Sequence, residues 1–243
     1  MLGDLYYSIL TQPLLNLLIF FYNLVGDIGL AIIIVTVIIR LILYPSFKHQ
    51  LESQKRLQQL QPKVQELRER HKDDRQKQAQ EQMELFKREG VNPLGSCLPI
   101  IVQLIVLIAL YRVFLTGLNG EALAGLYSFM SNPGTIDPTT VFGFNLSERN
   151  IFLAVITGAV QFVQSKMMTK LQPKPSTSGS DQGAAMANMM SKQFLYVFPV
   201  LTVVIGSQLP AGLVLYWFAT TLFSVLQQFL VMRKPVEVIS PPK

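Results

Sequence analysis

A single positive charge lies inside a strongly apolar run near the N-terminus. The run from Ile28 to Pro45 reads IGLAIIIVTVIIRLILYP, and its only charged side chain is Arg40. A run of about 20 apolar residues is typical of a membrane-spanning helix, and an arginine near its centre costs roughly 2.5–3.5 kcal/mol on insertion scales. Thr36 lies one turn earlier on the same helix face. The two residues predict a polar site inside the membrane.

A second interpretation of Arg40 is that its long side chain reaches the membrane surface. At 1.5 Å per residue, Arg40 lies only ~10 Å along the helix from Phe47. Lys48 and His49 follow and mark the end of the span. An arginine side chain can extend part of this distance toward water. The residues around Arg40 therefore leave both interpretations open.

The composition is that of a multi-pass membrane protein. The chain has 243 residues, 50% of them hydrophobic, and a mean hydropathy of +0.35. Its net charge of +6 does not indicate nucleic acid binding, because the basic residues gather in particular loops and no nucleic-acid motif accompanies them. Cys97 is the only cysteine, and the two histidines, His49 and His71, lie far apart. We therefore expect no disulfide and no metal site within the chain.

The apolar segments offer no catalytic pattern. They contain no Ser-His pair, paired aspartates or metal cluster, and no GxxxxGK[ST] phosphate-binding motif occurs in the chain. We expect a protein that is not an enzyme and holds no cofactor.

Two apolar stretches have lengths that do not match the thickness of a membrane. Pro13–Val25 is too short to cross about 30 Å of hydrocarbon as a helix, so we expect it to lie along the membrane interface. Phe194–Met232 would reach ~58 Å as one helix, nearly twice that thickness. It must fold back, and Ser207–Gly212 (SQLPAG) carries the turn signals.

A charged segment follows the first apolar run. Between Lys48 and Glu89 there are eleven basic and eight acidic residues. Apolar residues recur within it at helical spacing, which predicts a helical hairpin at the membrane surface: Leu57, Leu60, Val64, Leu67, Met83 and Phe86. The alternative is a solvated pair of helices without a partner.

These segments predict an all-α protein with five transmembrane helices, an interfacial N-terminal helix and a cytoplasmic helical hairpin. Placing the basic loops in the cytoplasm puts the N-terminus outside and the C-terminus inside. The expected segments are an external N-terminal part (1–27), the first span (28–47), the hairpin (48–93), the second span (94–115), an external loop (116–150), the third span (151–168), a flexible cytoplasmic connection (169–193), the fourth span (194–209), the fifth span (210–232) and a cytoplasmic tail (233–243).

Four stretches in this order resemble the YidC-type membrane protein insertases, a family with relatives in mitochondria and chloroplasts. They are IIRLILYP, LQPKVQELRERHKDD, VNPLGSCLPIIVQ and FPVLTVVIGSQLPAGLVLYW, which span most of residues 28–232. The resemblance implies a five-helix core around a hydrophilic groove, in the inner membrane of a bacterium. It implies that the groove is closed toward the outside.

The resemblance also implies roles for individual residues. Arg40 would be the charge of the groove, with Thr36 and Gln103 lining it, and Tyr216 and Trp217 would face an entering segment. Two of these assignments have alternatives. Gln103 could make a routine contact between helices, and Tyr216 and Trp217 could belong to an aromatic belt.

The function that the resemblance implies is that of a membrane protein insertase and chaperone. It would receive nascent hydrophobic segments in the hydrated groove and release them sideways into lipid. Its expected partners are nascent membrane proteins, membrane lipids, the ribosome and the main translocation channel, with nucleic acid only through the ribosome. The alternative is a small-solute transporter or anion channel with Arg40 as the counter-charge. Against it, the chain shows neither repeated halves nor matched broken helices.

Overall fold

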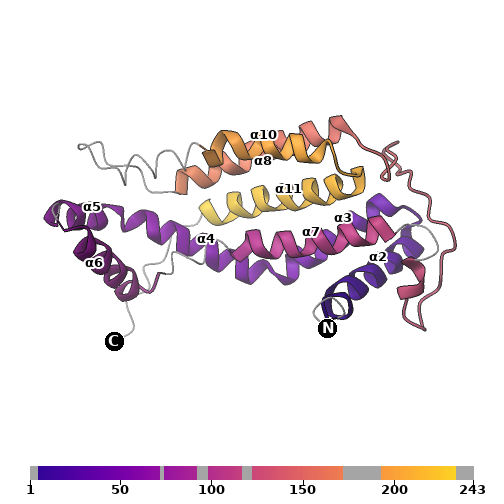
Figure 1. Ribbon diagram of the computed structural model, residues 1–243, viewed down its shortest axis with the longest axis horizontal. Helices are drawn as coiled ribbons and strands as arrows, with labels where there is room; N and C mark the ends of the chain where they lie inside the picture. The colour runs from indigo at the N-terminus through magenta and orange to yellow at the C-terminus, as the bar shows by residue number, and fades with distance from the viewer. Residues whose placement is uncertain (1–4, 72–73, 92–97, 117–121, 172–192, 234–243) are drawn as a thin grey trace.

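The computed structural model describes residues 5–71, 74–91, 98–116, 122–171 and 193–233. Within these ranges the regular structure is helical, apart from two isolated β-bridges. Figure 1 shows an elongated bundle in which α8 and α10 form one layer, α11 lies in the middle, and α3 and α7 lie on the other side. The expected all-α membrane fold is confirmed. Cys97, residues 172–192 of the expected cytoplasmic connection and residues 234–243 of the expected tail lie outside the described residues.

The helices of the bundle start close to the expected spans. They are α3 (Ile28–Ile42), α7 (Leu98–Thr116), α8 (Ile151–Leu171), α10 (Phe198–Gly206) and α11 (Ala211–Arg233), with a π-helical turn, η4 (Gln193–Val197), before α10. By length and composition, the described part holds three helices able to cross a membrane, or four if the bent pair α3 and α4 counts as one span. The count of five spans stays a prediction.

The N-terminal helix is longer than the sequence suggested. Helix α2 (Gln12–Val25) continues a π-helical turn, η1 (Tyr7–Thr11), so that Tyr7–Val25 forms one apolar stretch of 19 residues. The expectation of a segment too short to span was therefore wrong, because it began at Pro13. Pro13 has no backbone N–H to donate, and the stretch accommodates it with the π-helical turn Tyr7–Thr11 just before it. Figure 1 shows α2 inclined to the axis of the bundle, and α2 ends at Gly26, whose φ is 72°.

A sharp bend separates the first span from the charged segment. Helix α4 (Tyr44–Gln59) begins directly after α3 and is bent from it by 61°. Pro45 lies in the first turn of α4, where its missing N–H removes the hydrogen bond that would continue a straight helix. The bend directs the charged segment away from the bundle axis.

The charged segment forms a hairpin of helices α5 (Gln61–Arg70) and α6 (Arg75–Arg88) after α4. A small apolar cluster of buried side chains joins them: Leu60, Val64, Phe86 and Val91. Lys63 and Glu89 add an ion pair of 2.6 Å between the two arms.

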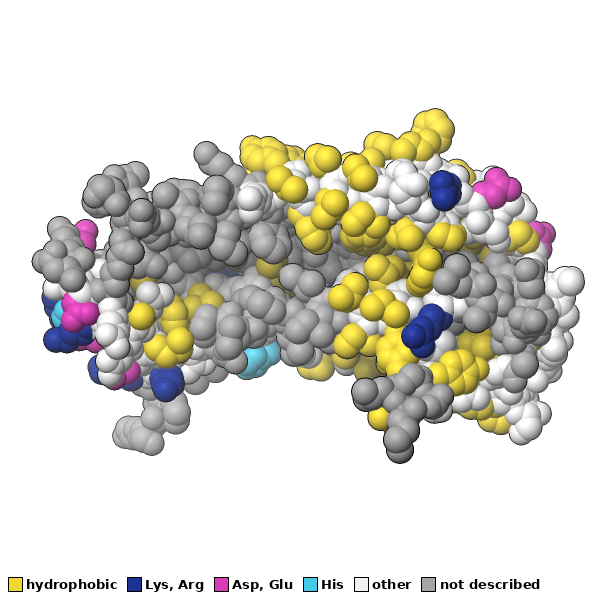
Figure 2. Space-filling model, in the orientation of Figure 1, with side chains coloured by type: hydrophobic (Ala, Val, Ile, Leu, Met, Phe, Trp, Pro, Cys, Tyr) yellow, Lys and Arg dark blue, Asp and Glu magenta, His cyan; other side chains and the backbone are white. Residues whose placement is uncertain are grey.

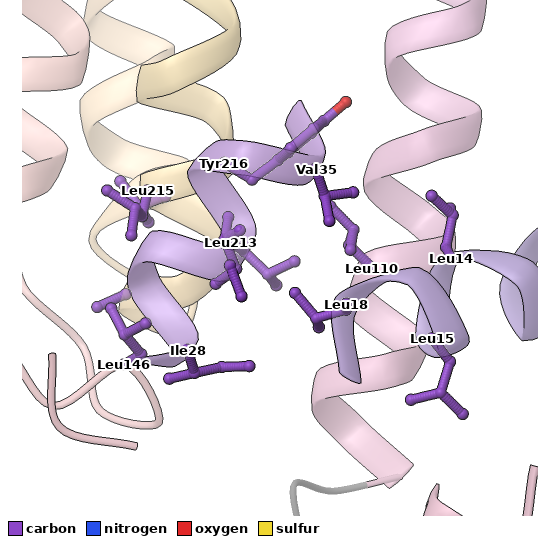
Figure 3. Close-up of a cluster of buried hydrophobic side chains, with 14 of the residues drawn as sticks. Leu14, Leu15, Leu18, Ile28, Val35, Leu110, Leu146, Leu213, Leu215 and Tyr216 are labelled. Carbon is purple, nitrogen blue, oxygen red and sulfur yellow. The ribbon is translucent and has the colours of Figure 1, made fainter. Parts of the chain in front are cut away.

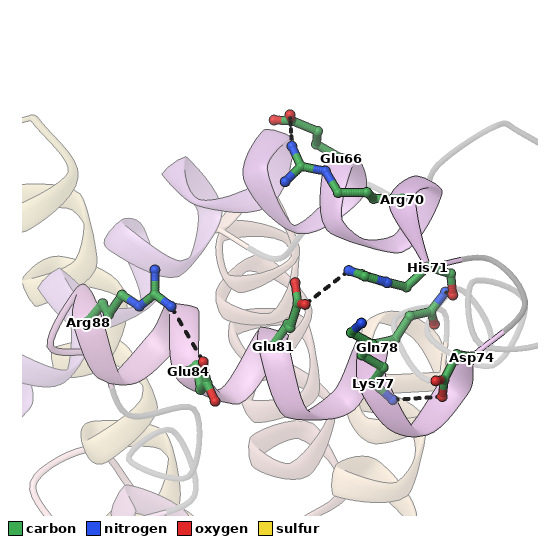
Figure 4. A network of polar contacts seen from close by, with 9 residues as sticks. All are labelled: Glu66, Arg70, His71, Asp74, Lys77, Gln78, Glu81, Glu84 and Arg88. Carbon is green, nitrogen blue, oxygen red and sulfur yellow. Dashed lines mark hydrogen bonds and ion pairs between the residues drawn. The ribbon is translucent and has the colours of Figure 1, made fainter.

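Polar contacts lie both between the two helices of the hairpin and along each helix (Figure 4). His71 Nε2 lies 3.0 Å from Glu81, and the backbone N–H of Lys77 donates to Asp74, which caps α6. Other pairs, such as Arg70 with Glu66, lie within one helix. Exposed pairs of this kind contribute about 0–1 kcal/mol each, so the apolar cluster holds the hairpin together.

The loop at 122–150 is fastened to one end of the bundle. Asn16 of α2 accepts a hydrogen bond of 2.8 Å from the N–H of Tyr127, and the backbone N–H of Ala211 donates to Glu148 at 2.7 Å. Asp27 caps α3 by accepting from the N–H of Leu30 at 2.7 Å, and its second oxygen accepts from the N–H of Val141 at 2.5 Å. One carboxylate therefore joins the start of the first span to the loop.

Replacing Asp27 is expected to loosen this end of the molecule. Asp27→Ala removes both the cap and the loop contact, and should lower the free energy of unfolding by about 1–2 kcal/mol. Asp27→Ser can still cap α3 but is too short to hold the loop as well, so its loss should be smaller. The unfolding midpoint of the detergent-solubilised protein, followed by circular dichroism, measures both. Equal midpoints for wild type and Asp27→Ala would contradict the assignment.

Candidate functional site

The interior of the bundle changes from apolar to polar along its length. In α3 the buried residues are apolar up to Val35 and then polar, at Thr36 and Arg40. In α11 they are apolar up to Leu215 and polar at several positions after Tyr216. The buried polar side chains of α11 are Thr220, Thr221, Gln227 and Gln228.

The other two long helices follow the same division. In α8 the buried Leu153 and Ala154 precede the buried Thr157, Gln161 and Ser165. Helix α7 runs in the opposite direction, and there the half-buried Gln103 comes first, followed by the apolar residues Val106, Ala109 and Leu110. Four helices thus place polar side chains in the same half of the bundle.

The apolar half forms a plug of buried side chains next to loop 122–150. Figure 3 shows leucines of α2, α7, α11 and the loop packed together with Ile28 and Val35 of α3. Its members include Leu14, Leu15, Leu18, Ile28, Val35, Leu110, Leu146 and Leu213. The described side chains of this plug are apolar and buried against one another.

Arg40 lies in the polar half and is only 8% exposed. Its guanidinium Nη2 donates a hydrogen bond of 3.2 Å to Gln103 Oε1, and the guanidinium carbon lies 4.6 Å from the centre of the Phe47 ring. Among the described residues no carboxylate pairs with it. Arg40 therefore faces the protein, keeps its charge uncompensated there, and retains donors for a further acceptor.

The remaining candidate residues lie at different depths. Thr36 is buried, and its hydroxyl donates to the Ile32 carbonyl at 2.6 Å. Tyr216 is buried, and Figure 3 shows its hydroxyl pointing away from the leucine cluster. Trp217, the next residue on α11, is half-buried. The structure thus joins Arg40 to Gln103 by a hydrogen bond and buries Thr36 and Tyr216, whereas Trp217 is less buried.

Two buried amide oxygens lack a partner within the described residues. They are Gln228 Oε1 of α11 and Gln54 Oε1 of α4. Gln227, beside Gln228, donates to the carbonyl of Tyr44 at 3.3 Å, which places this part of α11 against the start of α4. A buried amide oxygen without a hydrogen bond costs about 1–3 kcal/mol, so these positions favour contact with water or with a polar ligand.

Sequence reasoning missed most of the polar half. Thr157, Gln161 and Ser165 recur every four residues in α8, a spacing that puts them on one helix face. That spacing was a readable signal. Which face of α8 points inward, however, depends on packing against α10 and α11.

Comparison with known proteins identifies the family. The sequence model of the family described as 60Kd inner membrane protein matches residues 20–237. The chain belongs to this family. It is a multi-pass protein of the inner membrane.

Relatives of this protein are named as membrane protein insertases. It is 37% identical over 228 residues to the membrane protein insertase YidC of Fusobacterium nucleatum, covering 94% of this chain and 97% of that one. The YidC of Haemophilus influenzae is also 37% identical, but there the match covers 92% of this chain and only 37% of the relative. The chain therefore spans a little over a third of that longer relative.

A solved structure shares the fold. The crystal structure titled as an active YidC insertase with its first transmembrane domain resolved matches with a TM-score of 0.56 and 24% identity. The match covers 91% of this chain and 45% of that one. It confirms a helical membrane fold like that of YidC, while the five-helix count and the groove stay predictions.

Proposed function

We propose that this protein is a membrane protein insertase that receives nascent hydrophobic segments beside Arg40 and releases them into the bilayer. The observation that carries the proposal is the division of the interior, with a buried guanidinium that pairs with no carboxylate among the described residues in the polar half, and an apolar plug at the other end. Such an interior accepts a polar chain from one side and stops it from passing freely to the other. The longer relatives carry the insertase name, which supports the same activity.

The guanidinium would attract the polar flank of an entering protein. Two opposite unit charges ~6 Å apart gain about 3 kcal/mol at an effective dielectric constant near 20. Gln103, Gln228 and Gln54 supply amide groups that can replace water around a polar backbone as it enters. An acidic tail would therefore be held while its hydrophobic segment meets lipid.

The free energy for release would come from the substrate. Apolar residues at the centre of a new span gain about 0.3–0.6 kcal/mol each on insertion scales. An inside-negative potential would add ~2.3 kcal/mol per 100 mV for each acidic charge moved outward. These free energies are sufficient to move short tails with few charges across the membrane. They predict that long, highly charged tails need an additional translocation protein.

Orientation and partners belong to the same proposal. The hairpin α5–α6 would lie in the cytoplasm with the basic loops, and the plug and loop 122–150 would face outside. The hairpin would meet the ribosome or the translocation channel, and nascent membrane proteins would be the substrates.

Photocrosslinking during synthesis of a single-span protein tests the proposal. Photoreactive side chains at Thr36, Gln103 and Tyr216 should label the nascent chain. Val200 and Leu226 are exposed apolar residues of α10 and α11 and serve as lipid-facing controls. If the nascent chain labels the controls but not the three inner positions, the proposal that substrates are received beside Arg40 is wrong. Solute flux in vesicles of the purified protein, without insertion, would favour a channel or transporter instead.

A further inference from the structure

Two turns of loop 122–150 carry large apolar side chains at their tips. In the turn Tyr127–Met130 the N–H of Met130 donates to Tyr127 O at 2.9 Å, and Phe129 is 79% exposed. In the turn Thr140–Gly143 the two central residues, Val141 and Phe142, are 70% and 53% exposed. Turns that face water usually carry Gly, Asn, Asp, Ser or Pro. The exposed Phe129, Val141 and Phe142 depart from this pattern.

The second turn holds its apolar residues outward. It closes a short hairpin in which the N–H of Thr140 donates to Phe144 O at 3.0 Å and the N–H of Gly143 donates to Thr140 O at 2.8 Å. Gly143 has a φ of 76°, which glycine adopts without strain. The N–H of Phe142 also donates to Thr140 Oγ1 at 3.2 Å. These bonds fix the backbone, so Val141 and Phe142 cannot fold inward without breaking them.

The contacts of the loop fix its depth. Asp27 accepts both from the N–H of Leu30, in the first turn of α3, and from the N–H of Val141. A Cβ at Gly29 of α3 would overlap Thr140, so the hairpin lies directly against the start of α3. The second turn therefore sits level with the end of a membrane-spanning helix, where lipid headgroups meet acyl chains.

The tips continue a surface that already faces lipid. Helix α8 follows the loop directly and begins with the exposed residues Ile151 and Phe152. The first turn is joined to α2, where Asn23 donates to Ser131 O at 2.8 Å and the neighbouring Leu24 is 70% exposed. Acyl chains can surround separate protruding side chains, whereas a stable protein interface needs about 800 Å² of continuous surface on each partner.

We propose that Phe129, Val141 and Phe142 insert into the interfacial region of the adjacent lipid leaflet and anchor loop 122–150 there. The anchor would hold the loop over the apolar plug while substrates enter the other half of the bundle. The proposal does not depend on the insertase activity, because it concerns only where this loop lies in the bilayer.

Spin labels at single cysteines test the proposal. In full-length protein with Cys97→Ser, we would introduce Phe129→Cys or Phe142→Cys, with Ser147→Cys, an exposed polar position of the same loop, as the matched control. Each labelled protein is reconstituted into vesicles of phosphatidylethanolamine and phosphatidylglycerol. Collision rates with oxygen, which concentrates in lipid, and with a water-soluble nickel chelate are then compared. A label at Val155, an exposed residue of α8, reports correct seating in the bilayer.

The expected result is an oxygen-to-nickel ratio at positions 129 and 142 that is several-fold higher than at position 147 and approaches that at 155. Ratios at 129 and 142 equal to that at 147 would overturn the proposal, because the tips would then face water. Low collision rates with both reagents would overturn it as well, since they would place the tips against protein.

Discussion

Replacing Arg40 by glutamate is expected to block insertion of proteins whose translocated tail is acidic. The variant replaces an attraction of about 3 kcal/mol by a repulsion of similar size at ~6 Å. Because each ~1.4 kcal/mol corresponds to a factor of ten, insertion should fall by more than tenfold. Arg40→Lys keeps the charge and should retain most activity, with Arg40→Ala in between. Protease protection of the tail in vesicles containing the purified protein measures the inserted fraction.

A neutral substrate provides the control for Arg40. Asparagine and glutamine in place of the acidic residues of the tail should make insertion nearly independent of the residue at position 40. The folding of each variant needs checking, because Arg40 also contacts Gln103 and Phe47. Equal insertion of the acidic tail by the Lys, Ala and Glu variants, all folded, would show that the charge at position 40 is incidental.

Making the inner face of α8 apolar is expected to impair insertion without unfolding the protein. Thr157→Val and Gln161→Leu together keep the side-chain volumes nearly unchanged. Among the described residues the Thr157 hydroxyl donates to Leu153 O of its own helix, at 2.6 Å, and Gln161 donates to Gln164 at 3.1 Å. Leu153 O keeps its backbone hydrogen bond within α8 and the half-buried Gln164 can reach water, so neither substitution leaves a buried polar group without a partner. The unfolding midpoint should therefore stay level or rise.

Insertion by the same double variant should fall about tenfold, an effect of ~1.4 kcal/mol, because the polar half would hold less water. Phe162→Leu is the matched control on α8, since Phe162 is exposed on the outer surface. The control should insert substrates like wild type. If the double variant has the unfolding midpoint of wild type and inserts substrates equally well, α8 does not contribute to the site.

Figure 2 shows the apolar outer surface of the bundle. Hydrophobic side chains cover the layer over α8 and α10 and the layer over α7. Exposed residues of α10 such as Val200 and Val204 belong to the outer apolar surface, which suits contact with lipid.

Local features of the fold were predictable because they depend on nearby residues. Apolar runs near Ile28, Ile151 and Ala211 marked helices that the structure contains, and Pro45 marked the end of the first. The N-terminal helix was misjudged because Pro13 resembled a start signal, while helical turns from Tyr7 precede it. A proline tolerated near a helix start does not prove that the helix starts there.

The sequence by itself determined the helical membrane fold and singled out Arg40, because a charge within an apolar run is visible without any tertiary information. The tertiary structure added the hydrogen bond from Arg40 to Gln103, which the resemblance had only placed in the same groove, and it alone decided that Thr157, Gln161 and Gln228 lie in the same half of the interior. The reason is that helix rotation and relative height are set by side-chain packing between residues far apart in the chain. Hydrophobicity within one span does not specify either of them.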